Sequence, residues 1–198
     1  MGSLIVQQFV SVDGFAGDES GEFALFDDAA VSDELDNATL ARLESVDAIL
    51  LGATTYRMFA SYWPTSDSDQ ELLAARINEL PKIVFSTTLE EAPWGEFEPA
   101  MVVADDAAEA VRRLKADLPG DLIVWGSLTL TDALFAAGLV DSLRIIVLPK
   151  VLGRGRSPFP AGASALDLSV ERANSYDAGL VMIDYRVRAA GERQAGEN

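Results

Sequence analysis

The stretch DAILLG, residues 47–52, followed by ATTYRMF, residues 53–59, decides the fold of this 198-residue chain. Its apolar run is typical of a short strand that is buried on both faces, and this run breaks at Gly52. A helix then follows, starting after Thr54 or Thr55. Such a start exposes unpaired backbone N–H groups, which can hold a phosphate or can simply belong to a well-capped helix.

The same alternation of strand and helix extends along the whole chain. The pattern predicts strands at 3–12, 47–52, 82–86, 101–104, 121–126 and 143–149, and helices at about 31–44, 70–80, 106–118 and 127–138 besides the one after Gly52. Two further strands, 166–176 and 180–188, are joined by a hairpin turn at residues 177–179. We therefore predict an α/β fold with a mostly parallel central sheet, helices on both faces and an antiparallel C-terminal hairpin. Residues 1–189 form a single predicted domain, and the polar tail 190–198 is expected to be frayed.

Composition excludes several classes of chemistry. The chain contains no cysteine and no histidine, so a disulfide framework, a thiolate nucleophile, a Cys/His zinc site and a Ser-His-Asp triad are all impossible. Any metal would have to sit on carboxylates alone, and we predict no metal site. If the protein is an enzyme, we expect a bound cofactor to carry the difficult chemistry.

Charge and hydropathy limit the partners and the location. The formal net charge is −17, which makes nucleic acid and anionic membrane surfaces poor partners. No stretch approaches the roughly 20 apolar residues of a membrane span. The N-terminus MGSLIVQQFV lacks the basic region of a secretory signal. We therefore expect a cytoplasmic protein that acts on a small molecule, and any bound anion needs a local device such as a helix N-terminus.

A second strand breaks at a glycine in IVWGSLTL, residues 123–130. Taken singly, Gly52 and Gly126 both fit ordinary capped helix starts, because serine and threonine are preferred N-caps. Two such turns at one edge of a sheet favour a nucleotide diphosphate or another elongated anion. Neither turn matches G-x-G-x-x-G, and the chain contains no G-x-x-x-x-G-K-[ST].

Five motifs in order resemble the dihydrofolate reductase-like family, in the branch related to the RibD C-terminal reductase domain of riboflavin biosynthesis. They are SVDGFAG (11–17), DAILLGATTY (47–56), KIVFSTTL (82–89), IVWGSLTLTDALFAAGLVDSLRI (123–145) and LPKVLGRGRSPF (148–159). The resemblance implies an oxidoreductase that uses NADPH, with NADH still open. It would pass hydride to a conjugated C=N or C=O group of a pterin-, pyrimidine- or flavin-like heterocycle, and a homodimer is expected.

The resemblance also implies which residues contact the cofactor. The phosphates would meet Gly52, Ala53, Thr54 and Thr55, and the adenosine end would lie beside Ser86 and Thr87. The pyrophosphate and ribose would meet Gly126, Ser127, Leu128 and Thr129. Phe9, Ala16 and Gly17 would hold the nicotinamide amide.

The substrate side is less distinct. Trp125 can wall the substrate pocket or be a core aromatic, and Arg154, with Arg156, can meet an anionic substrate or lie in an exposed loop. The balancing proton would come from water or from a carboxylate near Asp27, our catalytic candidate. Asp28, Asp33 and Glu34 are neighbouring candidates, and their plain alternative is a solvated helix start.

Two positions depart from the family pattern. Many members carry an arginine that meets the 2′-phosphate of NADPH, where this chain has Ala53 and Thr87. The absence of this arginine weakens the case for NADPH over NADH as the cofactor. Arg57 and Lys82 are remote candidates to bind the 2′-phosphate in its place. The departures also leave open a non-catalytic ligand-binding or oligomeric scaffold. That scaffold predicts a blocked groove, whereas an enzyme predicts an open cleft flanked by Gly52 and Gly126.

Overall fold

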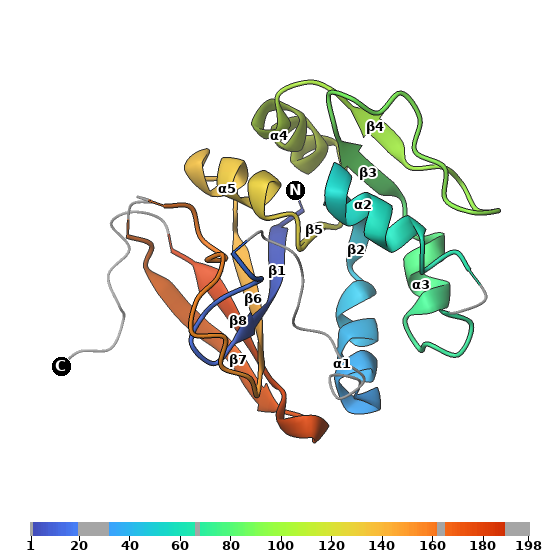
Figure 1. Ribbon diagram of the computed structural model, residues 1–198. Helices are drawn as coiled ribbons and strands as arrows, with labels where there is room; N and C mark the ends of the chain where they lie inside the picture. Colours follow the sequence, from blue (N-terminus) through green and yellow to red (C-terminus); the bar gives the residue numbers. More distant parts are fainter. Residues whose placement is uncertain (1, 20–31, 66–67, 162–164, 189–198) are drawn as a thin grey trace.

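The computed structural model describes residues 2–19, 32–65, 68–161 and 165–188, and an eight-stranded sheet runs through them (Figure 1). The strands are β1 (Leu4–Ser11), β2 (Val46–Gly52), β3 (Lys82–Phe85), β4 (Met101–Val103), β5 (Asp121–Trp125), β6 (Ser142–Leu148), β7 (Leu168–Ser175) and β8 (Val181–Val187). Their order is β4-β3-β2-β5-β1-β6-β8-β7. The neighbours from β4 to β6 pair in parallel, whereas β8 pairs antiparallel with β6 and β7 with β8. The predicted fold class is confirmed.

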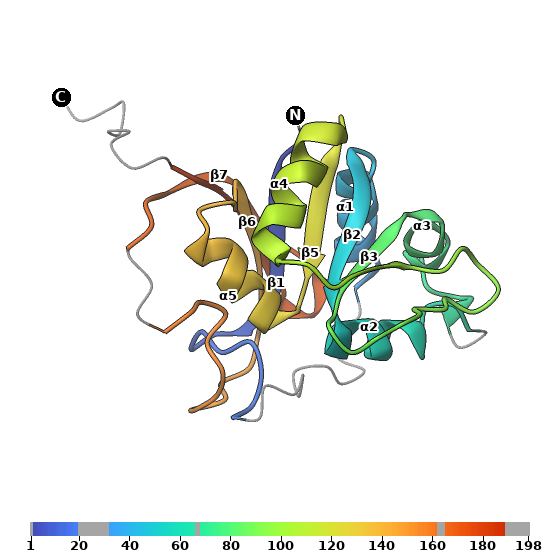
Figure 2. The same ribbon diagram turned by 90° about the horizontal axis from the view of Figure 1, so that it is seen from above.

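Helices cover both faces of the sheet. They are α1 (Asp33–Leu43), α2 (Ala53–Ala60), α3 (Ala74–Glu79), α4 (Ala107–Asp117) and α5 (Leu128–Ala136). Figure 2 shows α4 and α5 together on one side of the sheet, with α1 and α3 on the other. The helix predicted over 70–80 begins only at Ala74, because residues before it form turns; it ends before Pro81 as expected.

The apolar run of β2 is explained by burial on two faces. Leu51 packs in one core cluster with Ile77 of α3. Leu50, its neighbour in the strand, points the other way and packs with Val111 of α4 and Leu134 of α5. Leu50 and Leu51 are both fully buried. A central parallel strand between two helical layers therefore has no polar face, which is why DAILLG reads as a continuous apolar run.

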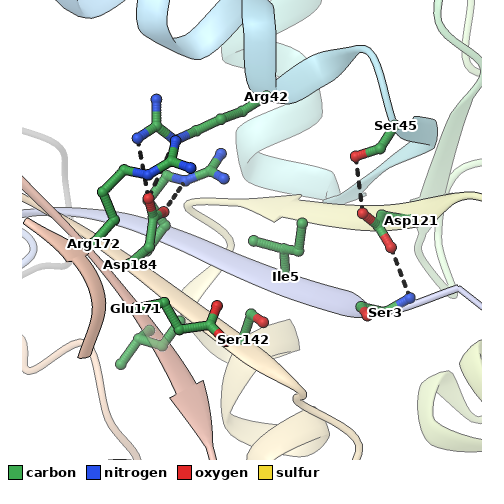
Figure 3. A pocket seen from close by; sticks show the side chains of 11 residues that line it. Ser3, Ile5, Arg42, Ser45, Asp121, Ser142, Glu171, Arg172 and Asp184 are labelled. Carbon is green, nitrogen blue, oxygen red and sulfur yellow. Dashed lines mark hydrogen bonds and ion pairs between the residues drawn. The ribbon is translucent and has the colours of Figure 1, made fainter. Parts of the chain in front are cut away.

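An ion cluster ties α1 to the C-terminal hairpin and lines a pocket of about 430 Å³ toward the amino ends of β1, β5 and β6 (Figure 3). Asp184 of β8 accepts from Arg42 of α1 at 3.2 and 3.1 Å and from Arg144 Nε of β6 at 2.7 Å. Arg144 Nη1 also donates to Gln7 Oε1 at 3.3 Å. One carboxylate thus compensates two largely buried guanidinium groups, at the sheet end opposite the glycine turns.

Candidate functional site

A cavity of about 1640 Å³ opens at the carboxyl ends of the central parallel strands. The resemblance assigns thirteen residues to the cofactor, and all of them except Gly17 line this cavity. They are Phe9, Ala16, Gly52, Ala53, Thr54, Thr55, Ser86, Thr87, Gly126, Ser127, Leu128 and Thr129. Gly17 does not line it and instead accepts a backbone hydrogen bond from Arg156 N–H at 3.1 Å. An open cavity flanked by both glycine turns is what the enzyme hypothesis requires and what a blocked groove would not give.

The two glycine turns are interlocked, because β2 and β5 are neighbours in the sheet. Gly52 N–H donates to Ser127 Oγ at 2.8 Å. In return, Ser127 N–H donates to Thr55 Oγ1 at 3.1 Å. The Ser127 hydroxyl also donates to the Trp125 carbonyl at 3.0 Å. The start of α2 and the start of α5 are therefore one structural unit.

Neither helix start is capped by the side chain of its own N-cap residue. Gly52, the N-cap of α2, has no side chain, and the hydroxyl of Ser127, the N-cap of α5, makes no cap hydrogen bond among the described residues. By contrast, Ser32 caps α1 and Asp106 caps α4 through their side chains. The prediction that the helix starts after Thr54 or Thr55 is wrong by two or three residues. α2 begins at Ala53, and the Thr55 hydroxyl serves the neighbouring turn.

The turn into α5 has an uncommon backbone. Gly126 has φ 55°, and Ser127, which carries a side chain, has φ 51° and ψ 51°. A left-handed conformation costs a non-glycine residue about 1–2 kcal/mol, and the hydrogen bonds of the Ser127 backbone and hydroxyl offset that cost. Strain held in this way often marks a ligand site. Here the strained residue lines the cavity.

The described residues that line the cavity include four carboxylates that the sequence reading did not single out: Glu19, Asp36, Glu71 and Asp105. Asp27 and Asp28 lie outside the described residues, and neither Asp33 nor Glu34 lines the cavity. Asp36 lies on α1 and lines it beside Leu35 and Thr39. Burial, with the charges of Glu71 and Asp33, raises the pKa of Asp36 to about 6. The sequence does hold a sign of this placement. Asp36 is next to Leu35, which forms the buried stripe of α1 together with Thr39 and Leu43.

Trp125 forms part of the cavity wall and part of the core. Its side chain is 6% exposed, and its ring lies 5.8 Å from that of Phe59. The indole Nε1 is buried without a hydrogen-bond partner among the described residues. The Trp125 side chain thus both lines the cavity and packs in the core.

Arg156 lines the cavity and Arg154 does not. The Arg154 side chain is 80% exposed and lies 3.5 Å from Glu19. Arg156 forms a bridge with Gly17, and its guanidinium pairs with Asp132 of α5. Gly155 allows the bridge, because a Cβ there would lie 2.2 Å from the Gly17 carbonyl oxygen. Of the two arginines in LGRGR, only Arg156 lines the cavity.

Neither remote substitute for the missing phosphate-binding arginine reaches the cavity. Arg57 is exposed and does not line it. Lys82 is buried, donates to the Asn78 carbonyl at 2.6 Å and lies 4.7 Å from the centre of the Trp94 ring. Burial lowers the pKa of Lys82 to about 8. Tyr56 donates its hydroxyl to the Pro93 carbonyl at 2.7 Å, which fits the expectation that it packs.

Comparison with known proteins decides the family, because the RibD C-terminal domain model matches residues 3–182. The chain belongs to the RibD C-terminal domain family. It is 28% identical over 185 residues to "Uncharacterized protein YyaP" of Bacillus subtilis (strain 168), covering 92% of this chain and 93% of that protein. The putative riboflavin biosynthesis protein of Shewanella sp. PV-4 has a similar structure, with a TM-score of 0.75 and 23% identity, covering 94% of this chain and 99% of that one.

Dihydrofolate reductase from Enterococcus faecalis, solved with NADP(H), shares the fold of this RibD C-terminal domain protein at a TM-score of 0.61. The identity is 12%, with 94% of this chain and 97% of that one covered. At such identities the structural likenesses establish the fold only. Within the described part of the chain, no helix is long and apolar enough to cross a membrane, and no group of three or more acidic side chains is placed to hold a metal ion.

Proposed function

We propose that this RibD C-terminal domain protein is a nicotinamide dinucleotide-dependent reductase of a small heterocycle. The observation that carries the proposal is the pair of uncapped helix starts, α2 and α5, which are joined by hydrogen bonds and line one cavity. A helix N-terminus favours an anion through its free N–H groups and its dipole. Two of them side by side suit the two phosphates of a dinucleotide in a chain whose net charge of −17 otherwise repels anions.

The cavity divides into two halves on either side of these helix starts. Toward β1, the wall is built from Phe9, Trp125 and Phe59 and carries the Asp36 carboxyl. Glu19 and Glu71 line the same cavity. Aromatic walls beside a few polar groups suit a flat heterocycle stacked near a nicotinamide ring. When bound there, the nicotinamide supplies the hydride. The chain's part is to hold the two rings together and to keep water from the wall that Trp125 closes.

Asp36 is the group that we propose to handle the proton. With a pKa raised to about 6, part of its population stays protonated near neutral pH, so it can donate to a ring nitrogen of the substrate. Ionised, it accepts from an N–H of a pterin- or pyrimidine-like ring. No histidine is present to do either. Arg156 lines the same cavity; its guanidinium pairs with Asp132, and its remaining N–H groups would serve an anionic substituent of the substrate.

An equilibrium titration tests the proposal. We expect calorimetry to show binding of NADH or NADPH to the wild-type protein. Gly52→Val should weaken it by at least about tenfold, because a branched side chain would keep phosphate from the helix start and remove hydrogen bonds to a charged group. The fold does not itself demand glycine here, since an added Cβ would lie 3.6 Å from Ser127, in ordinary contact.

Ala136→Val is the matched control, since it adds bulk to an exposed position at the other end of α5. It should leave binding unchanged, and thermal unfolding should show that both variants fold. The proposal fails if neither dinucleotide binds at millimolar concentration, or if Gly52→Val folds and binds as the wild type does.

A further inference from the structure

We infer that the cavity selects a dinucleotide whose adenosine ribose has a free 2′-hydroxyl, which is NADH rather than NADPH, and that Asp105 makes this selection. The inference rests on the proposed function and specifies its cofactor. It comes from the half of the cavity that lies toward β3 and β4, which Ser86, Thr87, Thr88 and Asp105 help to line.

The position of the helix starts assigns this half to the adenosine ribose. α2 and α5 begin at the ends of the central strands β2 and β5, so a pyrophosphate held there sends one arm toward β1 and the other toward β3 and β4. The arm toward β1 meets the aromatic wall and Asp36, where a substrate and the reacting ring must lie together. The remaining arm, which carries the adenosine, extends over the ends of β3 and β4.

The lining of the β3–β4 half combines the apolar residues Phe85, Val103, Ala104 and Ala107 with polar residues and one carboxylate. Ser86, Thr87 and Thr88 contribute hydroxyl groups, and Asp105 contributes a carboxylate from the end of β4. Ser86 Oγ already accepts from the N–H groups of Thr88 and Leu89, at 3.2 and 3.1 Å. Among the described residues that line this half, none is a lysine or an arginine. In many NAD sites a carboxylate accepts a hydrogen bond from the adenosine ribose hydroxyls. In NADP sites an arginine binds the 2′-phosphate instead.

The cations beside Asp105 are paired and do not line the cavity. Arg113 of α4 lies 3.5 Å from Asp105 and 3.9 Å from Glu109, and Arg112 lies 3.5 Å from Glu109. Two guanidinium groups thus pair with two carboxylates outside the cavity lining, and neither faces a 2′-phosphate there. Such a phosphate carries close to two negative charges near neutral pH, and it would face Asp105 across the cleft. A hydroxyl has no such repulsion and donates to the same carboxylate.

Calorimetric titration of the full chain with NADH and NADPH at fixed ionic strength tests the inference. We expect the wild type to bind NADH at least about tenfold more tightly, from one hydrogen bond to a charged acceptor together with the repulsion of the phosphate. Asp105→Asn should reduce the ratio of the two affinities toward one. Thr87→Arg should raise the affinity for NADPH, because a guanidinium is the group best suited to phosphate.

Asp117→Asn is the control, because it removes one negative charge from an exposed position at the far end of α4, the helix that follows Asp105. It should leave the ratio unchanged. Equal or tighter binding of NADPH by the wild type would overturn the inference and leave the proposed function standing. An unchanged ratio in Asp105→Asn would overturn the role of Asp105, and failure of both dinucleotides to bind would overturn both proposals.

Discussion

Replacing Asp36 by asparagine should stabilise the fold and impair the reaction at the same time. Burial raises the pKa of Asp36 from its ordinary 3.8 to about 6, so the folded state holds the proton more tightly than the unfolded chain does. Ionised Asp36 therefore costs the folded state stability as pH rises above 3.8, and the cost is complete above pH 6. Asparagine stays neutral and avoids that cost.

The magnitude follows from the displacement of this pKa. A change from 3.8 to about 6 corresponds to about 3 kcal/mol, and we halve this because the side chain is only about half buried and water screens its charge. We expect Asp36→Asn to unfold at higher urea concentration than the wild type, with a gain of about 1.5 kcal/mol at pH 8 that becomes smaller at pH 5.

Urea unfolding between pH 5 and pH 8 measures this difference directly. Asp117→Asn, an exposed change of the same chemistry, should show no comparable gain. A loss of stability in Asp36→Asn at pH 8, or a difference that does not change with pH, would refute the reasoning. If Asp36 also handles the proton, the variant should bind dinucleotide normally and lose turnover with any substrate that the wild type reduces.

Four further substitutions separate the structural roles. Asp184→Asn should lower the free energy of unfolding by about 3 kcal/mol in urea, because it leaves Arg42 and Arg144 without their shared carboxylate. Ser127→Ala should cost about 1–2 kcal/mol in the same assay through lost hydrogen bonds, and Ser127→Gly should cost less because glycine accepts φ 51°. Arg154→Ala should change neither stability nor calorimetric dinucleotide affinity, since its side chain is 80% exposed.

The architecture could be predicted because it rests on local and periodic signals. The apolar run of β2 and its break at Gly52 follow from burial between two helical layers, and the antiparallel hairpin follows from its turn at residues 177–179. The order of the strands then brings Gly52 and Gly126 to one edge. These features need only the chain's own pattern and the general rules of parallel sheets.

The side chains that complete the site depend on tertiary placement. Asp36 differs from Asp33 and Glu34 only in the face of α1 that it occupies, which the packing of Leu35 decides. Arg154 and Arg156 are alike in sequence, and the bridge to Gly17 separates them. Lys82 is a candidate phosphate ligand by sequence, but its ammonium group donates to the Asn78 carbonyl. None of these contacts is local enough to read from spacing.

The central claim is that a dinucleotide binds at the interlocked starts of α2 and α5, and amide NMR tests it most directly. During titration of the 15N-labelled protein with NADH, we predict the largest chemical-shift changes at the amides of residues 52–55 and 126–129. The amides around the Arg42–Asp184 cluster, at the opposite end of the sheet, should not move. Saturable binding that leaves residues 52–55 and 126–129 unperturbed would contradict the account.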